Sequence, residues 1–375
     1  MSPSDRRANR DRNGFTAVLG LLLLAACASA TPSGAATQAP PAPPTGLHDA
    51  QFTEYSPLAA TSELVRRMLS PLAAEAISRD MARRGEALKE RAVDLTRETF
   101  ALYVPRVSPP RGYGVLVFVP PWPDARLPPE WALVLDRFGV IFVSAAGSGN
   151  DANVVGRRAP LAVLAAANVA MRYRIDADRV FVGGFSGGSR VALRLALDYP
   201  DVFHGAFLNA GSDAIGGPSM PLPSPDLLAR FQKTTRLFLA TGDEDSVSML
   251  LDTGTVSSLH RLCVSNVKDI TIARTGHAVA PPDVLATGLA YLAGTPSGAD
   301  AAGACRQAVA RQVADGVQAT ERALAEPDRN VARKAVLALD RRFGGLVGAE
   351  IIGMADRCRC DLLHEAAITP DNSPR

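Results

Sequence analysis

Histidine and cysteine are scarce in this sequence, and neither sign of charge is in marked excess. There are five cysteines and five histidines among 375 residues, and no set of them has the spacing of a zinc finger. The 40 basic and 38 acidic side chains leave a formal net charge of +2. We therefore expect no nucleic acid or other polyanionic partner, no metal centre and no cofactor.

The apolar run near the N-terminus is too short to span a membrane and stay there. It covers residues 17–26, follows four arginines within the first twelve residues and precedes Cys27. A charged segment, an apolar segment and small residues at a cleavage site are the parts of a secretory signal peptide, so residues 1–26 are predicted to be one. Its removal takes away four arginines and two aspartates and brings the formal net charge to zero.

The residues around Cys27 resemble the lipobox of bacterial lipoproteins. Leu24-Ala25-Ala26-Cys27 is similar to that motif, in which the cysteine is acylated and becomes the mature N-terminus. The residue after Cys27 is Ala28 and not an aspartate, and this is similar to the sorting pattern of lipoproteins of the outer membrane. The resemblance implies a protein of the bacterial cell envelope, anchored by lipid at the outer membrane. An ordinary signal peptide cut nearby is the alternative.

Four further cysteines would then lie outside the reducing cytosol, where two disulfides can form. Three pairings are open, and the sequence does not choose among them. A metal site at Cys358-x-Cys360 is the less favoured interpretation, because no suitable set of further ligands accompanies it. The four are Cys263, Cys305, Cys358 and Cys360.

The chain divides into segments of different composition and periodicity. With 47% hydrophobic residues it can bury one large core and a smaller accessory region. Apolar positions between 61 and 91 recur at helical spacing with a break near Pro71, and from about residue 301 the pattern is helical only. The predicted segments are the signal peptide (1–26), a flexible Pro- and Ala-rich tether (27–50), N-terminal helices (51–91), an α/β domain (92–296), a C-terminal helical region (301–364) and a disordered tail (365–375).

Apolar strands alternate with helical patterns throughout the α/β domain. The first two strands, 99–104 and 113–120, are predicted to form a hairpin with its turn at Pro109–Gly112. Continuous apolar strands separated by helices indicate a mostly parallel sheet with helices on both faces. The further strands are predicted at 140–144, 180–183, 206–210, 237–240 and 270–273, and the helices near 129–138, 159–173, 187–199 and 283–292.

Residues 179–199 are predicted to form a strand, a tight turn and a helix. The turn contains Gly184-Phe185-Ser186-Gly187-Gly188, which matches the G-x-S-x-G nucleophile elbow. Its glycines tolerate a sharp backbone and leave the serine hydroxyl exposed at the end of the strand. A plain glycine-rich turn is the simpler alternative. We predict Ser186 as a nucleophile.

A serine hydroxyl needs a base to take its proton and a carboxylate to orient that base, and on this type of sheet they follow the serine in the order acid, histidine. His48 precedes Ser186 and fails this order. His277 lies in a loop between the last predicted strand and its helix, and is the predicted base. Three acids follow the strand at 237–240 directly; Asp245 is the predicted partner, with Asp243 as second choice.

The oxyanion formed by attack on a carbonyl group needs hydrogen-bond donors. The amide of Gly187 is predicted as one of them. The loop after the strand that ends near Pro120 should provide the other; because Pro121 and Pro123 have no N–H, Trp122 is the expected donor. Phe185 and Trp122 are also candidates for lining the substrate pocket, with simple core packing as the alternative.

With these residues placed, residues 92–295 resemble the α/β-hydrolase superfamily, and within it the poly(3-hydroxybutyrate) depolymerase and feruloyl-esterase-like group. Residues 173–203 are similar to the longest block that the group shares, Gly242-x-x-Asp245 to its acid loop, and Gly276-His277 to its histidine loop. The resemblance is why Asp245 is preferred to Asp243. One departure is Pro120-Pro121, where the group has His-Gly.

The resemblance implies a serine hydrolase that cleaves carboxylic esters of small-molecule or polymeric substrates through an acyl-enzyme. Two alternatives stay open. A serine peptidase could use the same three residues on the same fold. A non-catalytic, lipid-anchored protein of this fold is the other alternative, because of the missing His-Gly and the additional helices.

Overall fold

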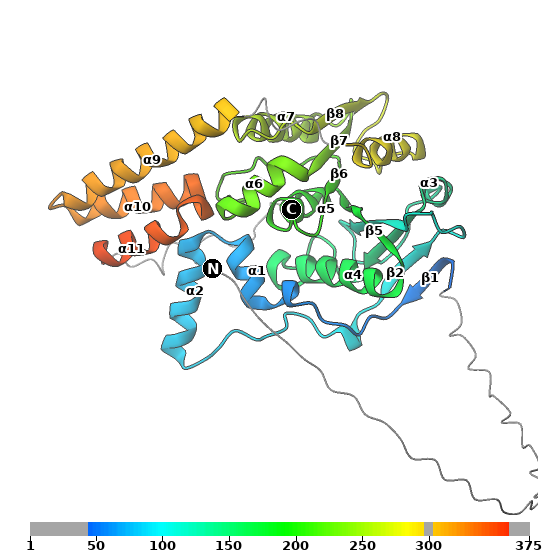
Figure 1. Cartoon of the computed structure of the whole chain (residues 1–375), viewed down its shortest axis with the longest axis horizontal. Helices are drawn as coiled ribbons and strands as arrows, with labels where there is room; N and C mark the ends of the chain where they lie inside the picture. Colours follow the sequence, from blue (N-terminus) through cyan, green and yellow to red (C-terminus); the bar gives the residue numbers. More distant parts are fainter. Residues whose placement is uncertain (1–43, 296–302, 360–375) are drawn as a thin grey trace, which may run out of the picture. The chain divides into compact units, whose positions relative to one another are not determined.

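The computed structural model describes residues 44–295 and 303–359 (Figure 1). The predicted signal peptide, Cys27, most of the predicted tether and the predicted tail from 365 lie outside these residues. Of the predicted helical region at 301–364, the structure describes 303–359.

Eight strands form one sheet in the order β1-β2-β4-β3-β5-β6-β7-β8. β2 is antiparallel to both of its neighbours, and every other pair from β4 to β8 is parallel. This sheet with its covering helices is the α/β-hydrolase fold, as the sequence predicts. The strands are β1 (Gly46–Ala50), β2 (Phe100–Val104), β3 (Tyr113–Val119), β4 (Val140–Ala145), β5 (Ile175–Phe185), β6 (Gly205–Asn209), β7 (Arg236–Gly242) and β8 (Val267–Ile272).

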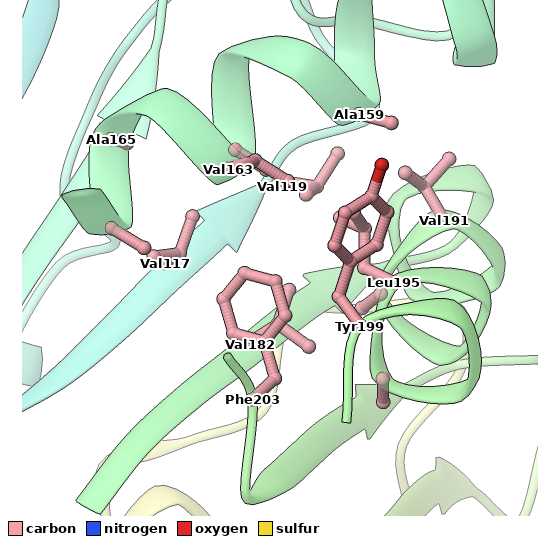
Figure 2. Close-up of a cluster of buried hydrophobic side chains, with 14 of the residues drawn as sticks. Val117, Val119, Ala159, Val163, Ala165, Val182, Val191, Leu195, Tyr199 and Phe203 are labelled. Carbon is pink, nitrogen blue, oxygen red and sulfur yellow. The ribbon is translucent and has the colours of Figure 1, made fainter. Parts of the chain in front are cut away.

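Helices cover both faces of the sheet, as β3 makes clear. Successive side chains of a strand point to opposite faces. Val117 belongs to a buried cluster with residues of α4 and α5 (Figure 2), and Phe118 to a second cluster with residues of α3 and α8. The helices around the sheet are α3 (Trp131–Phe138), α4 (Ala159–Arg172), α5 (Gly187–Asp198), α6 (Pro225–Thr234), α7 (Ser246–Arg261) and α8 (Pro282–Leu292).

The predicted hairpin is wrong, although both of its strands exist. β2 and β3 do not pair, because β4 lies between them and pairs with both. The turn signal at Pro109–Gly112 marks where the chain reverses, but turn residues carry no information about which strand becomes the neighbour. β1 also departs from the prediction, since its residues were assigned to the tether and instead pair with β2 at the edge of the sheet.

One described helical stretch is long and apolar enough to cross a membrane. It runs from Val154 to Arg172 and includes α4, which directly follows a π-helical turn at Val154–Arg158. Of its most apolar 18 residues, 67% are buried inside the protein. It packs against β3 and β4, so it is a core helix.

The predicted N-terminal and C-terminal helices pack together. A break near Pro71 is confirmed, where Ser70 caps the second helix. The hydroxyl of Ser70 donates to the carboxylate of Asp340 at 2.6 Å. The helices are α1 (Thr61–Met68), α2 (Pro71–Arg84), α9 (Gly303–Ala325), α10 (Arg329–Phe343) and α11 (Gly348–Cys358) (Figure 1).

A disulfide between Cys263 and Cys305 joins the end of α7 to the start of α9. The structure thereby selects one of the pairings that the sequence left open. Cys358 is disulfide-bonded as well, and Cys360 lies outside the described residues.

Candidate active site

Ser186 lies in the turn between β5 and α5, in a strained backbone conformation. Its φ of 56° and ψ of −125° are rarely adopted by residues with a side chain. The glycines on either side make this turn possible. A Cβ on Gly184 would lie 2.2 Å from the carbonyl carbon of Gly188, and one on Gly188 would lie 1.9 Å from the carbonyl oxygen of Val119. Both glycines of the motif are therefore required by close backbone packing.

The structure brings Ser186, His277 and Asp245 together at the C-terminal edge of the parallel strands. The hydroxyl oxygen of Ser186 lies 2.9 Å from Nε2 of His277. Nδ1 of the same ring lies 2.5 Å from Oδ2 of Asp245. An ionised carboxylate only accepts hydrogen bonds, so Nδ1 carries the proton of the neutral imidazole and Nε2 is free to accept from the serine.

Asp245 holds its carboxylate in place by capping a helix. It is the N-cap residue of α7, and Oδ1 accepts a hydrogen bond from the backbone N–H of Ser248. Burial raises the pKa of Asp245, but hydrogen bonds from His277 and Ser248 outweigh it and hold the pKa below its usual value. The carboxylate is therefore ionised at neutral pH, as an orienting acid must be.

Asp243, the second choice for the acid, contacts the histidine loop in a different way. Its Oδ1 accepts from the backbone N–H of Thr275 at 3.1 Å. The backbones also pack closely here, because a Cβ on Gly242 would lie 2.0 Å from the carbonyl oxygen of Thr275. The acid loop and the histidine loop thus hold each other, and Asp243 positions the loop while Asp245 contacts the ring.

Gly187 and Trp122, the two predicted oxyanion donors, belong to segments that meet at the elbow, and their role stays a prediction. Gly187 is the first residue of α5, so its N–H has no partner within the helix. Trp122 follows β3, whose end abuts the elbow at Gly188. The N–H of Gly147 donates to the carbonyl of Pro123, which fixes the backbone next to Trp122.

Two arginines of the π-helical turn form hydrogen bonds with the loops that follow β3 and β4. Arg158, only 4% exposed, donates to the carbonyl oxygens of Ser148 and Pro120, both at 3.0 Å. Arg157 donates to the carbonyl of Gly147 and makes a two-pronged ion pair with Glu98. The loop after β3 and the loop after β4 are therefore held together by charge-assisted hydrogen bonds.

Phe185 and Trp122 lie beside the three residues but differ in exposure. The ring of Phe185 is 4.9 Å from the imidazole of His277 and 6.1 Å from the indole of Trp122. Phe185 is only 8% exposed and belongs to a core cluster, whereas Trp122 is half-buried. Both rings therefore border the site, and Phe185 also fills the core.

Two residues at the site were not singled out in the sequence. Ser248 lies on α7, with its hydroxyl 3.4 Å from Nδ1 of His277. Asn150 follows β4, and its carboxamide lies against Gly187. The position of Asn150 just after a predicted strand was a usable signal, because the carboxyl ends of parallel strands share one edge of a sheet. Among residues 44–295 and 303–359, no group of three histidine, cysteine or acidic side chains is arranged to hold a metal ion.

No protein-family model and no curated protein matches the sequence. Solved structures similar to part of the chain include a putative dipeptidyl aminopeptidase IV from Bacteroides ovatus, with 17% identity and a TM-score of 0.39; the match covers 52% of this chain and only 33% of that one. An S-formylglutathione hydrolase from Staphylococcus aureus has 11% identity and a TM-score of 0.41, over 52% and 93% of the two chains. A ferulic acid esterase has 14% identity and a TM-score of 0.39, over 51% and 89%. At such low similarity, the fold rests on the strand order and the elbow, and no activity is transferred.

Proposed function

We propose that the protein is a serine hydrolase that cleaves carboxylic esters. The observation that carries this proposal is the chain of two hydrogen bonds from Ser186 through His277 to Asp245, built on a strained elbow. If residues 184–188 were only a glycine-rich turn, a histidine and an ionised aspartate from two other loops would not be expected to align with its serine. The same alignment argues against the non-catalytic alternative.

The reaction follows from these contacts. The oxygen of Ser186 attacks the ester carbonyl carbon, its proton passes to Nε2 of His277, and the carbonyl electron pair becomes an oxyanion. The N–H groups of Gly187 and Trp122 stabilise that oxyanion. When the carbonyl reforms, the bond to the alcohol oxygen breaks and His277 donates its proton to the leaving alcohol. Water then attacks the acyl-enzyme in the same way and releases the acid and the free serine.

Asp245 acts on the histidine and not on the substrate. It holds the ring in the tautomer that can accept from Ser186, and stabilises the imidazolium formed in each half of the reaction. His277 is 47% exposed, so substrate and water can reach the reacting atoms from solvent.

The proposal is tested by comparing substrates on one enzyme preparation. We expect turnover of short p-nitrophenyl esters by the purified chain and none by Ser186→Ala, with aminoacyl anilides cleaved far more slowly. Faster cleavage of the anilides would point to a peptidase instead. Ester turnover that survives in Ser186→Ala would contradict the assignment of the nucleophile.

We further propose that the mature chain is tethered to a bacterial envelope membrane by acylation of Cys27. The signal-peptide pattern supports this, and a disulfide at Cys263–Cys305 is consistent with an oxidising compartment. In a bacterial host fed an alkyne fatty acid, we expect labelling of the natural chain and loss of labelling in Cys27→Ala. Equal labelling of both would exclude Cys27 as the acylated residue.

A further inference from the structure

We propose that Asn150 is a third oxyanion donor, its side-chain NH₂ pointing at the same oxygen as the N–H of Gly187. This inference rests on the proposed ester hydrolysis. Its starting point is a deficit in the loop after β3, where Pro120, Pro121 and Pro123 have no N–H. Near the elbow, that loop offers only the backbone N–H of Trp122. A hydrogen-bond donor from another loop would therefore add to the stabilisation of the oxyanion.

The carboxamide of Asn150 lies directly against the elbow. A Cβ built on Gly187 would be 2.2 Å from Oδ1 of Asn150 and 3.1 Å from Nδ2. A half-turn of the carboxamide exchanges the positions of its oxygen and its nitrogen. Since both positions are close to Gly187, the NH₂ group is next to Gly187 in either orientation. Gly187 has no side chain, which leaves room for the carboxamide to approach this closely.

The separation of the donors suits one shared oxygen. A Cβ and the nitrogen of its own residue are about 2.5 Å apart, so Nδ2 lies within about 5.6 Å of the amide nitrogen of Gly187. Two donors that each lie about 2.7 to 3.1 Å from the same oxyanion must be no more than about 6 Å apart. The side chain of Asn150 therefore meets the distance requirement.

The backbone of Asn150 is fixed while its carboxamide is available. The backbone N–H donates to the carbonyl of Pro121 at 3.0 Å. The preceding Gly149 packs so closely on Trp122 that a Cβ would lie 2.7 Å from the carbonyl carbon of Trp122. The side chain is exposed, and within residues 44–295 and 303–359 it makes no hydrogen bond. The backbone of Asn150 is therefore held in place, and its carboxamide gives up no hydrogen bond within the described residues when it donates to an oxyanion.

The two most informative substitutions remove the donor in different ways. Asn150→Asp keeps the shape and replaces NH₂ by oxygen, and Asn150→Ala removes the group. We expect kcat for a p-nitrophenyl ester to fall by roughly 10²- to 10³-fold in Asn150→Ala, and at least as far in Asn150→Asp, with little change in KM. Binding of a trifluoromethyl ketone, which forms a tetrahedral oxyanion on Ser186, should weaken in parallel. Asp151→Asn, an exposed neighbour in the same turn, is the matched control and should keep kcat.

Stability separates a catalytic role from a structural one. Since no side-chain hydrogen bond is lost, the Tm of Asn150→Ala should equal that of the natural chain. Unchanged kcat and unchanged ketone binding in both variants would overturn the inference, and so would an effect on KM alone. A natural chain that fails to turn over any ester would instead overturn the proposed function, and this inference with it.

Discussion

Two carboxylates at the end of β7 have different tasks although only one residue separates them. Asp245 is 9% exposed and contacts the imidazole, whereas Asp243 is at the surface and contacts the backbone of Thr275. Hydrogen bonds from the backbone of Arg274 and Thr275 lower the pKa of Asp243. Both carboxylates are thus ionised at neutral pH, and geometry alone distinguishes them.

Substitution of the two acids should therefore give very different results. Asp245→Asn keeps the shape but lets the side chain donate to Nδ1, which stabilises the wrong tautomer of His277. We expect kcat to fall by about 10⁴-fold. The matched Asp243→Asn should keep most of the activity, because the amide oxygen can still accept from Thr275. Stopped-flow or steady-state ester hydrolysis measures both; a larger loss in Asp243→Asn would mean that the two roles are exchanged.

Chain order was enough to find the serine and the histidine, whereas the choice of Asp245 over Asp243 depended on the family resemblance, and the residues that surround these three were not found. Ser186, Asp245 and His277 follow the ends of three predicted strands, and such ends meet at one edge of a parallel sheet. Whether their side chains reach one another depends on loop conformations that no periodicity reveals. Ser248 was missed for that reason, since it contacts the site from a helix whose approach is set by tertiary packing. The position of Asn150 after a predicted strand was a signal, but its contact with Gly187 depends on the conformation of the loop.

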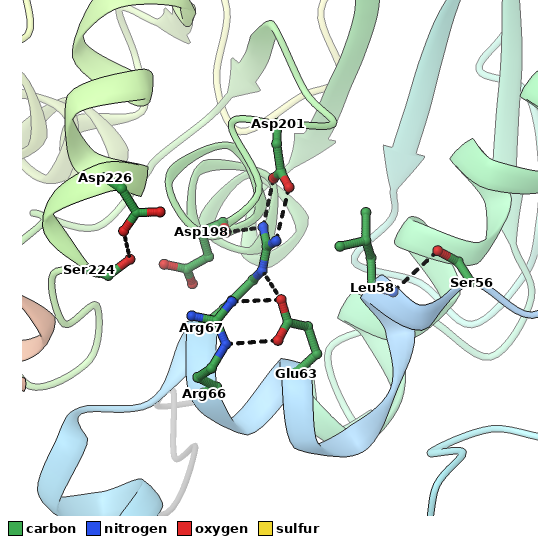
Figure 3. Close-up of polar contacts among 9 residues, drawn as sticks. All are labelled: Ser56, Leu58, Glu63, Arg66, Arg67, Asp198, Asp201, Ser224 and Asp226. Atoms are coloured by element: carbon green, nitrogen blue, oxygen red, sulfur yellow. Dashed lines mark hydrogen bonds and ion pairs between the residues drawn. The ribbon is translucent and has the colours of Figure 1, made fainter.

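At the scale of elements, α1 is joined to the end of α5 by a partly buried charge network (Figure 3). Arg67 makes a two-pronged ion pair with Asp201 at 2.6 and 2.9 Å, and also contacts Glu63 and the carbonyl of Asp198. The side chain of Asp198 is 2% exposed. Burial raises the pKa of Asp198 to about 8, while Arg194 and Arg67 oppose the rise. Asp198 is therefore largely protonated in the folded protein near neutral pH.

This pKa makes stability depend on pH in a defined direction. The pKa of an unfolded aspartate is about 3.9, so between about pH 4 and 8 the folded state binds more protons than the unfolded state. Stability should thus fall as pH rises through that window, and level off above it. Asp198→Asn, which is neutral throughout, should flatten the fall in Tm between about pH 5 and 8. Asp226→Asn, at a nearby exposed carboxylate, is the control and should leave the slope unchanged. An identical slope in Asp198→Asn would contradict the buried, protonated state.

The positions of the strands in the sequence were predicted better than the pairing between them. Val140–Ala145 and Arg236–Gly242 each contain a run of four apolar residues, at 140–143 and 237–240, as expected for strands buried on both faces, and were found within two residues of their ends. The predicted hairpin failed because pairing is decided by packing of the whole sheet. β1 was missed because a short edge strand is not buried on both faces, and its alternation follows directly on a proline-rich segment.

At the scale of the whole described molecule, several contacts hold the C-terminal helices, and three of them differ in kind. The disulfide Cys263–Cys305 is covalent. The buried carboxylate of Asp340 accepts hydrogen bonds from Ser70 and from the backbone N–H of Leu72. Close backbone packing places Gly345 so that a Cβ would lie 2.5 Å from the carbonyl carbon of Pro223. None of these contacts involves the three aligned residues of the site.

Loss of the disulfide should therefore cost stability and spare catalysis. The bond spans 42 residues of sequence, and a loop of that size is worth about 4 kcal/mol in the chain-entropy description. We expect Cys263→Ser/Cys305→Ser to unfold at a lower denaturant concentration while its kcat at low temperature stays close to that of the natural chain. A loss of kcat without a loss of stability would show that the C-terminal helices contribute to the site.

The most direct test of the whole account is the position of a covalent adduct. After reaction with a fluorophosphonate, digestion and peptide mass analysis should find one modified residue, Ser186, and prior unfolding of the protein should abolish the modification, because reactivity depends on His277 and Asp245 being aligned. A protein that stays unmodified when folded, or an adduct on any other residue, would contradict the claim that these three side chains form a working nucleophile.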